Sequence, residues 1–528
     1  FVSDIFALEG MRSYTFSPDE KMMLVKTDSE SIYRRSSKDR YFVVDISSGE
    51  RTEVFTKGLI SNPSWSPNGK RIAFTYENNL FVKDLATEEI VQITEDGVYN
   101  QIINGMADWV YEEEFGFTRA FEWNADGSKI AYLKFDEREV PEFTMTNYKN
   151  GMYPEYQTFK YPKVGEKNSV VTVHVYDIKS NSTFDVNLDP SIEYIPRLKW
   201  SEKPRELVVF TMNRLQNTLE LLLIDTKQQN SLTLLKESSP YYVDIHDNMT
   251  FVKNGNQFLW TSEKDGYNHI YLFNMQGKEL QQITKGEWEV TSFYGYEPSE
   301  NRVYYQAAKT TAMDRQIFSV QLDGKKEREI AAAKGTNRAQ FSSTFDYYVL
   351  NHSDINTPTN YTVYDRKGKK LRTIVDNAQV MELMKTHGVT SVEFVEVPSG
   401  EESLNAFIMK PDNFDPSKKY SVFMYVYGGP GSQTVTNSWQ GQNYWWFQSL
   451  VQKGYIVVSV DNRGTGARGE MFKKMTYKQL GKYEIEDQIN AAKHMASLPY
   501  VDGDRIGIFG WSYGGYMSSL AITKGADV

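Results

Sequence analysis

The segment Arg505–Gly515 holds a serine between two glycines, in the order Gly510-Trp511-Ser512-Tyr513-Gly514. An apolar run, Ile506–Phe509, precedes it, and a helix-like run from Tyr516 follows it. A Gly-x-Ser-x-Gly pattern between a strand and a helix is typical of a nucleophile elbow, in which a sharp turn exposes the serine hydroxyl. The alternative is a glycine-rich turn with an incidental serine. The flanking elements favour the elbow and predict nucleophilic catalysis by Ser512.

A nucleophilic serine needs a general base, and behind an elbow of this kind an Asp or Glu and then a His follow along the chain. All six histidines precede Ser512, and Asp527 is the only acid after it. His494 falls in a helix-like stretch before the elbow, and we interpret it as structural. We therefore expect the catalytic Asp and His beyond Val528.

An oxyanion hole is the second requirement of such chemistry, because hydrogen-bond donors must face the charge that develops in the transition state. The backbone N–H of Tyr513, directly after the nucleophile, is one expected donor. A second donor is expected from the segment after an earlier apolar strand, Tyr425–Pro430. On residues alone, the favoured explanation of Tyr427 is a packed side chain at a strand end before a Gly-Gly-Pro turn.

The acidic run Tyr111–Phe115 contains three consecutive glutamates, Glu112, Glu113 and Glu114. Asp108 before the run predicts a short helical turn that this residue caps. The residue types alone fit a solvated charge run as well as a binding site.

Seven repeats indicate the architecture that carries these residues. Each repeat consists of a strand, a polar turn, a second strand and a third strand that ends at Asp, Asn or Gln. The intervals between their starts are 49, 58, 77, 51, 44 and 45 residues, and periods of about 40–50 residues with several strands each indicate propeller blades. The two longest intervals predict insertions, which hold Asp108–Gly116 and Tyr148–Lys167. The repeats start at Thr15, Ser64, Glu122, Lys199, Thr250, Tyr294 and Ala339.

After about residue 390 the pattern changes to apolar runs that alternate with helix-like ones. The expected strands are 422–427, 455–460 and 506–509, and the expected helices are 444–453 and 484–497. This order is typical of a parallel sheet covered on both faces. We therefore predict a β-propeller over residues 1–388, with an insertion near 105–117, followed by the N-terminal part of an α/β-hydrolase domain over residues 389–528.

The composition excludes several other classes of protein. The chain has 528 residues, a net charge of −10 and no cysteine. The acidic balance argues against nucleic acid as a partner, and the absence of cysteine excludes disulfides and thiolate metal sites. No segment reaches the roughly 18 apolar residues of a membrane span, and no targeting segment is recognisable. No metal or other cofactor is expected.

Several segments resemble the S9 prolyl oligopeptidase family of serine peptidases, and within it the dipeptidyl peptidase IV branch. The catalytic-domain segments are Tyr425–Gln433, Val460–Gly469, Leu480–His494 and Gly510–Tyr516. The more specific ones are Asp108–Phe115, Phe135–Phe143, Glu263–Leu272 and Ile283–Val290. The resemblance covers nearly the whole chain. It implies a propeller of about eight blades, of which one is expected to be cut at the N-terminus, and a hydrolase domain truncated in this chain.

The resemblance also implies roles for individual residues. Glu113 and Glu114 would bind the α-amine of the substrate, and Tyr427 would donate its hydroxyl to the oxyanion. An arginine would contact a peptide carbonyl, and the register favours Arg34, with Arg35 as the alternative. A solvated loop is the other explanation of these two arginines.

The predicted function is a serine exopeptidase that releases Xaa-Pro and Xaa-Ala dipeptides from peptides with a free N-terminus. Alternatives within the family are prolyl tripeptidyl, acylaminoacyl and endopeptidase forms. Outside it, they are an esterase and a propeller interaction module with an inactive hydrolase domain. The resemblance further implies a homodimer and a periplasmic, cell-surface or secreted location.

Overall fold

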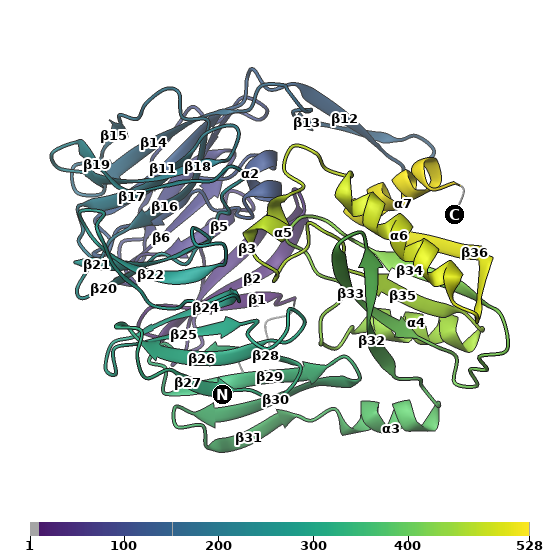
Figure 1. Cartoon of the computed structure of the whole chain (residues 1–528). Coiled ribbons are helices and arrows are strands. Elements are labelled where there is room, and N and C mark those ends of the chain that lie inside the picture. Colours follow the sequence, from purple (N-terminus) through teal and green to yellow (C-terminus); the bar gives the residue numbers. More distant parts are fainter. Residues whose placement is uncertain (1–9, 150, 527–528) are drawn as a thin grey trace. The chain divides into compact units, whose positions relative to one another are not determined.

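The computed structural model describes residues 10–149 and 151–526. The chain forms two compact units, residues 1–245 and residues 246–528, and Figure 1 shows their elements in sequence colours. Among the described residues, no helix combines the length and the apolar character that crossing a membrane requires.

The first unit consists mainly of four antiparallel sheets, one of which has a fifth strand, β9. Neighbouring sheets share apolar cores, as where Val43 of the first sheet packs with Phe74 and Phe81 of the second. The strands are β1 (Ser13–Phe16), β2 (Met22–Ser31), β3 (Ser37–Asp45), β4 (Arg51–Glu53), β5 (Ser61–Trp65), β6 (Arg71–Tyr76), β7 (Asn79–Asp84), β8 (Ile90–Gln92), β9 (Ile102–Asn104), β10 (Phe121–Trp123), β11 (Lys129–Asp136), β14 (Val170–Asp177), β15 (Ser182–Val186), β16 (Tyr194–Trp200), β17 (Glu206–Met212), β18 (Thr218–Asp225) and β19 (Asn230–Ser238).

Two insertions interrupt these sheets at the places that the long repeat intervals predict. The first contains helix α2 (Trp109–Glu114), between β9 and β10. The second contains the hairpin of β12 (Glu142–Asn147) and β13 (Glu155–Lys160), between β11 and β14. In Figure 1 this hairpin projects from the sheets of the first unit.

The second unit begins with three further antiparallel sheets of four strands. Sheets β20–β23 and β24–β27 share a core that includes Leu272 and Val303. The strands are β20 (Thr250–Val252), β21 (Gln257–Ser262), β22 (His269–Asn274), β23 (Glu279–Gln282), β24 (Val290–Glu297), β25 (Arg302–Ala307), β26 (Gln316–Gln321), β27 (Arg328–Ala331), β28 (Thr336–Phe341), β29 (Tyr347–Asp354), β30 (Thr357–Asp365) and β31 (Lys370–Val375).

Each of the seven predicted repeats corresponds to one of these sheets. Every repeat start lies in the first strand of a sheet, and every third strand ends at an Asp, Asn or Gln, as predicted. These residues are Asp45, Asp84, Asp177, Asp225, Asn274, Gln321 and Asp365. The terminal aspartates close turns, since the Asp45 carboxylate accepts backbone N–H groups from Ser47 at 2.9 Å and Ser48 at 2.8 Å. These sheets are consistent with a propeller domain.

The rest of the second unit is an α/β layer around a five-stranded sheet. The strand order is β32-β33-β35-β34-β36, and β34 pairs in parallel with both β35 and β36. Its elements are α3 (Ala378–Thr386), β32 (Val392–Ser399), β33 (Glu402–Met409), β34 (Tyr420–Val426), α4 (Gln442–Gln452), β35 (Ile456–Val460), α5 (Glu470–Lys474), α6 (Tyr483–Ser497), β36 (Val501–Gly510) and α7 (Tyr513–Lys524).

The expectation of a purely parallel sheet is wrong at one edge. Strands β32 and β33 form an antiparallel hairpin, because the turn at Gly400 and Glu401 is too short for a crossover, and β33 pairs antiparallel with β35. The three predicted strands and two predicted helices are present, as β34, β35, β36, α4 and α6.

Helices α4 and α6 pack on opposite faces of this sheet. Along β35, Ile456 and Val458 pack with Ala491 of α6. Val457, between them, packs with Phe447 of α4. Successive strand side chains point to opposite faces, so β35 is buried on both sides, as its continuous apolar sequence predicts.

Candidate active site

Ser512 occupies a strained turn between strand β36 and helix α7. Its φ is 56° and its ψ is −115°, a combination that residues with a Cβ atom rarely adopt. The flanking glycines permit the turn. A Cβ atom at Gly510 would lie 2.3 Å from the carbonyl oxygen of Val426, and one at Gly514 would lie 2.1 Å from it. Ser512 is exposed, and this geometry is that of a nucleophile elbow.

No histidine of the described residues is hydrogen-bonded to Ser512. Five of the six are held by other partners. His494 lies on helix α6. The partners are Asp185 for His174, Thr261 for His246, Thr284 for His269, Asn337 for His352 and Leu383 for His387. Nor do residues 10–149 and 151–526 hold a cluster of three or more His, Asp or Glu side chains placed to bind a metal ion.

The two expected oxyanion donors lie next to the elbow. Tyr513 is the first residue of α7, so its N–H has no acceptor within the helix. Tyr427 directly follows β34, and its ring centroid is 6.3 Å from that of Tyr513. A Cβ atom at Gly429 would lie 2.9 Å from Cε1 of Tyr427 and 3.2 Å from Cγ of Tyr513. The glycine therefore lets both rings pack against the same turn, with Tyr427 36% exposed.

Helix α2, in the first unit, carries the three consecutive glutamates. Asp108 caps it as predicted, because its carboxylate accepts the backbone N–H of Tyr111 at 2.9 Å. The same carboxylate accepts the hydroxyl of Ser169 at 2.6 Å, and burial raises its pKa. The Tyr111 hydroxyl accepts the N–H of Ile195 at 3.0 Å. The short helix is thus fixed at its start by buried hydrogen bonds.

The three glutamates have different surroundings. Glu112 is 1% exposed, and its carboxylate accepts the backbone N–H groups of Arg35 at 2.6 Å and Ser36 at 3.0 Å. It is therefore a structural residue that joins α2 to the turn between β2 and β3. Sequence reasoning missed this role, since the contact spans 77 residues. Glu113 and Glu114 are less buried.

Arg34 lies beside Glu113, with 3.0 Å between Nε and Oε2. Its side chain is 68% exposed, so the pair is open to solvent. The guanidinium of Arg35 instead donates to the backbone carbonyl of Glu112 at 3.4 Å. Desolvation and the like charge of Glu113 raise the pKa of Glu114, although part of this side chain is open to solvent. A cationic ligand would offset that repulsion.

Two family models match this chain. The family model described as the dipeptidyl peptidase IV (DPP IV) N-terminal region matches residues 17–359. The prolyl oligopeptidase family model matches residues 441–528.

The chain is 32% identical over 536 residues to a probable dipeptidyl peptidase 4 of Aspergillus flavus, covering 97% of this chain and 69% of the relative. It is 33% identical over 543 residues to dipeptidyl peptidase 4 of Trichophyton tonsurans, covering 98% and 69%. The crystal structure of Porphyromonas gingivalis dipeptidyl peptidase 4 superposes with a TM-score of 0.93 at 39% identity, over 98% of this chain and 73% of that one. By these matches, the chain belongs to the dipeptidyl peptidase IV branch of the prolyl oligopeptidase (S9) family of serine peptidases.

Proposed function

We propose that this protein is a serine exopeptidase that releases Xaa-Pro and Xaa-Ala dipeptides from the free N-terminus of peptides. The observation that carries the proposal is the pair of solvent-accessible carboxylates, Glu113 and Glu114, on a helix that Glu112 fixes. A site that holds the substrate's α-amine leaves room for only a short segment before the scissile bond. The names of the relatives support the same activity.

In this mechanism Ser512 Oγ attacks the carbonyl carbon of the second substrate residue. The N–H of Tyr513 and the hydroxyl of Tyr427 stabilise the oxyanion, and the C–N bond breaks to leave an acyl-enzyme that water hydrolyses. Arg34 contacts a substrate carbonyl. A histidine acting as the general base takes the serine proton and gives it to the leaving amine.

The proposal also covers the number of propeller blades and the boundary between the two domains. Residues 1–388 belong to a propeller of about eight blades, of which the seven observed sheets are seven, with the substrate-binding insertion near 105–117. Residues 389–528 contribute the first part of an α/β-hydrolase domain. The strand-to-helix change near β31 and α3 supports this boundary. We also propose a periplasmic, cell-surface or secreted location, from family membership.

The proposed function is tested by removing the negative charge of each of the two carboxylates in turn. Glu113→Gln and Glu114→Gln should each lower kcat/KM for a Gly-Pro amide by about 10- to 150-fold, because a desolvated charge-assisted hydrogen bond contributes roughly 1.5–3 kcal/mol. Hydrolysis of a small acyl ester should change little. N-acetylation should cause a comparable loss in the wild type and a smaller one in the Gln variants, since both changes remove the same ion pair.

Glu139→Gln is the matched control, because Glu139 lies in the second insertion and its side chain is 70% exposed. Activity should fall above about pH 8 as the substrate amine loses its proton. The raised pKa of Glu114 means that it is protonated at a higher pH than an ordinary glutamate. Activity on the amide should therefore also fall towards acid pH, and Glu114→Gln should remove that contribution. Equal cleavage of free and acetylated substrates would refute the exopeptidase assignment, and release of tripeptides would indicate a tripeptidyl peptidase.

The turn of the β12–β13 hairpin exposes several large apolar side chains. Tyr148 is 83% exposed, Met152 95% and Tyr153 84%. Exposed apolar patches of this kind mark interaction sites, and we propose that this hairpin contributes to a homodimer. Tyr148→Ser combined with Tyr153→Ser should shift the mass measured by light scattering from dimer to monomer, while an active-site serine probe still labels Ser512. An unchanged dimer mass would show that the hairpin is not the interface.

A further inference from the structure

Helix α6 has three polar residues on one face that are almost fully buried. Glu484 and Asp487 are 0% exposed and Gln488 is 2% exposed. Their spacing of three and four residues places them on the same side of the helix. Polar and charged groups are rarely buried without partners, because their desolvation is unfavourable. The partners of these side chains therefore show what this face of α6 holds in place.

Glu484 holds the residue that follows the nucleophile. Its carboxylate accepts the hydroxyl of Tyr513 at 2.5 Å and the backbone N–H of Gly481 at 3.0 Å. Burial, together with the neighbouring charge of Glu484, raises the pKa of Tyr513, so this hydroxyl stays protonated and keeps donating. The contact fixes the side chain of the residue whose backbone N–H is the first oxyanion donor.

Gln488 is connected to the second donor through one intermediate side chain. Its Nε2 donates to Oδ1 of Asn462 at 3.0 Å, and Nδ2 of Asn462 donates to the carbonyl oxygen of Gly428 at 3.0 Å. Asn462 is 0% exposed. A Cβ atom at Gly428 would lie 2.4 Å from Oδ1 of Asn462, so the two residues are in close contact. This chain of hydrogen bonds ends one residue after Tyr427.

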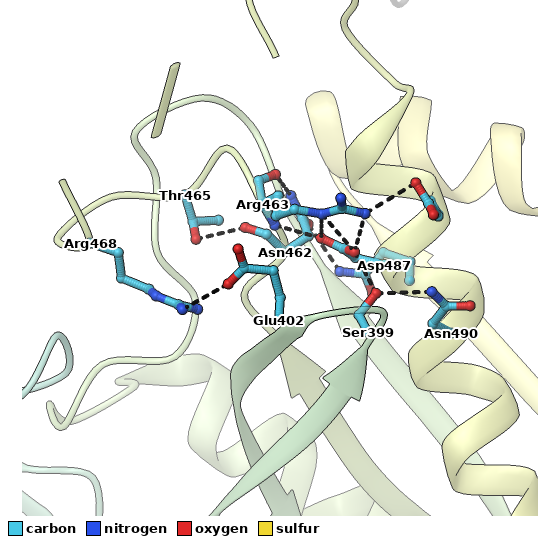
Figure 2. A network of polar contacts seen from close by, with 10 residues as sticks. Ser399, Glu402, Asn462, Arg463, Thr465, Arg468, Asp487 and Asn490 are labelled. Carbon is cyan, nitrogen blue, oxygen red and sulfur yellow. Dashed lines mark hydrogen bonds and ion pairs between the residues drawn. The ribbon is translucent and has the colours of Figure 1, made fainter. Parts of the chain in front are cut away.

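The loop that carries Asn462 is itself fixed from α6. Asp487 accepts Nη2 of Arg463 at 2.8 Å and the hydroxyl of Ser399 at 2.6 Å, and Figure 2 shows Arg463, Asp487 and Ser399 in one network. Farther along the same loop, the N–H of Gly466 donates to the carbonyl oxygen of Ser432, in the loop after β34, at 3.1 Å. The loops after β34 and β35 are thus joined by backbone bonds as well as through Asn462.

We infer that Glu484 and Gln488 are positioning residues that set the two oxyanion donors relative to each other from one helix face. The inference rests on the proposed function, because it takes Tyr513 and Tyr427 as the donors. Oxyanion donors act only when they lie about 2.7–3.1 Å from the developing charge. A small displacement of either turn would therefore lower the rate of acylation more than it lowers substrate affinity.

The test compares four variants of the full-length enzyme. Glu484→Gln replaces one acceptor oxygen by an NH₂ donor, so Tyr513 and Gly481 can no longer both donate to it. Tyr513→Phe removes the other partner of the same bond, and Gln488→Met breaks the contact with Asn462. Each should lower kcat for a dipeptide amide by about 10- to 100-fold, somewhat less than complete loss of a donor, with KM nearly unchanged. Lys493→Gln, on the same helix with an exposed side chain, should keep wild-type kinetics.

Two further measurements distinguish positioning from a general structural role. Affinity for a boronic acid that forms a tetrahedral adduct should fall with kcat, while affinity for a non-covalent ligand with the same amine should not. Losses from Glu484→Gln and Tyr513→Phe should not add, because both remove one interaction. Thermal unfolding will show whether Glu484→Gln folds. If it does not, the kinetics of Tyr513→Phe test the inference, since this variant loses only a hydroxyl.

Wild-type kcat in both Tyr513→Phe and Gln488→Met would overturn the inference, as would losses confined to KM. Failure of this inference can be distinguished from failure of the proposed function. The variants Glu113→Gln, Glu114→Gln and Ser512→Ala test the proposed function without changing α6.

Discussion

Replacement of Ser512 by alanine is expected to abolish peptide hydrolysis while leaving the stability of the fold nearly unchanged. In the proposed mechanism the Ser512 hydroxyl is the attacking group, and removal of the equivalent group in a well-studied serine peptidase lowers kcat by about 10⁶-fold. Ser512 is exposed, and its side chain makes no hydrogen bond within the described residues that the substitution would break. The residual rate comes from substrate binding and the oxyanion hole alone. Steady-state hydrolysis of a Gly-Pro amide and thermal unfolding measure the two effects.

Ser519→Ala is the matched control for this variant. Ser519 lies on the same helix, α7, and its exposed hydroxyl donates to the backbone carbonyl of Gly515 at 2.9 Å. This variant should keep wild-type activity and should still react with a fluorophosphonate probe, whereas Ser512→Ala should not react. Normal turnover by Ser512→Ala would show that the elbow does not carry the nucleophile.

Tyr427→Phe is expected to lower kcat/KM for amide substrates by about 10²- to 10³-fold. In the proposed mechanism this hydroxyl donates to the oxyanion, so it contributes mainly in the transition state, and one such donor contributes roughly 2.7–4 kcal/mol. The affinity of non-covalent inhibitors should change little, because they develop no oxyanion. Rapid-mixing measurement of acylation would locate the loss in the first chemical step.

Tyr425→Phe is the control for the loss of a tyrosine hydroxyl, because Tyr425 lies in strand β34, which directly precedes Tyr427. The Tyr425 ring packs 5.3 Å from that of Phe447 in the core, so the phenyl group retains its packing. An unchanged acylation rate in Tyr427→Phe would make Tyr427 a packed strand-end residue, the explanation that the residues alone favour.

Local sequence patterns predicted the parts of the fold that depend on neighbouring residues. The repeat starts and the strand-ending aspartates are correct because apolar alternation and turn chemistry are local. The fourth strand of each sheet was not predicted. Strand β31, for example, is exposed along its whole length, and its apolar residues Leu371, Ile374 and Val375 do not alternate. The antiparallel edge was missed because it depends on the pairing of β33 with β35, a strand that is distant in the chain.

In the candidate site, too, the features that depend on neighbouring residues were predicted and those that depend on distant residues were not. Asp108 as a helix cap and the turn at Ser512 follow from short motifs, and both are present. The roles of Glu112 and Glu484 were not predictable, since each depends on a partner that is distant in the chain: 77 residues for Glu112 and Arg35, and 29 for Glu484 and Tyr513. The sequence does not distinguish a buried glutamate from a solvated one, because the difference lies in their tertiary contacts.

The crowding around the Val426 carbonyl has a consequence for directed evolution of this enzyme. Positions 510 and 514 have no room for even a methyl group, with clearances of 2.3 Å and 2.1 Å to that oxygen. Saturation libraries at these two positions should return glycine alone. Trp511, between Gly510 and Ser512, is 79% exposed and should tolerate substitution. A campaign to change substrate range can therefore randomise the outer side of the turn while its two glycines are kept constant.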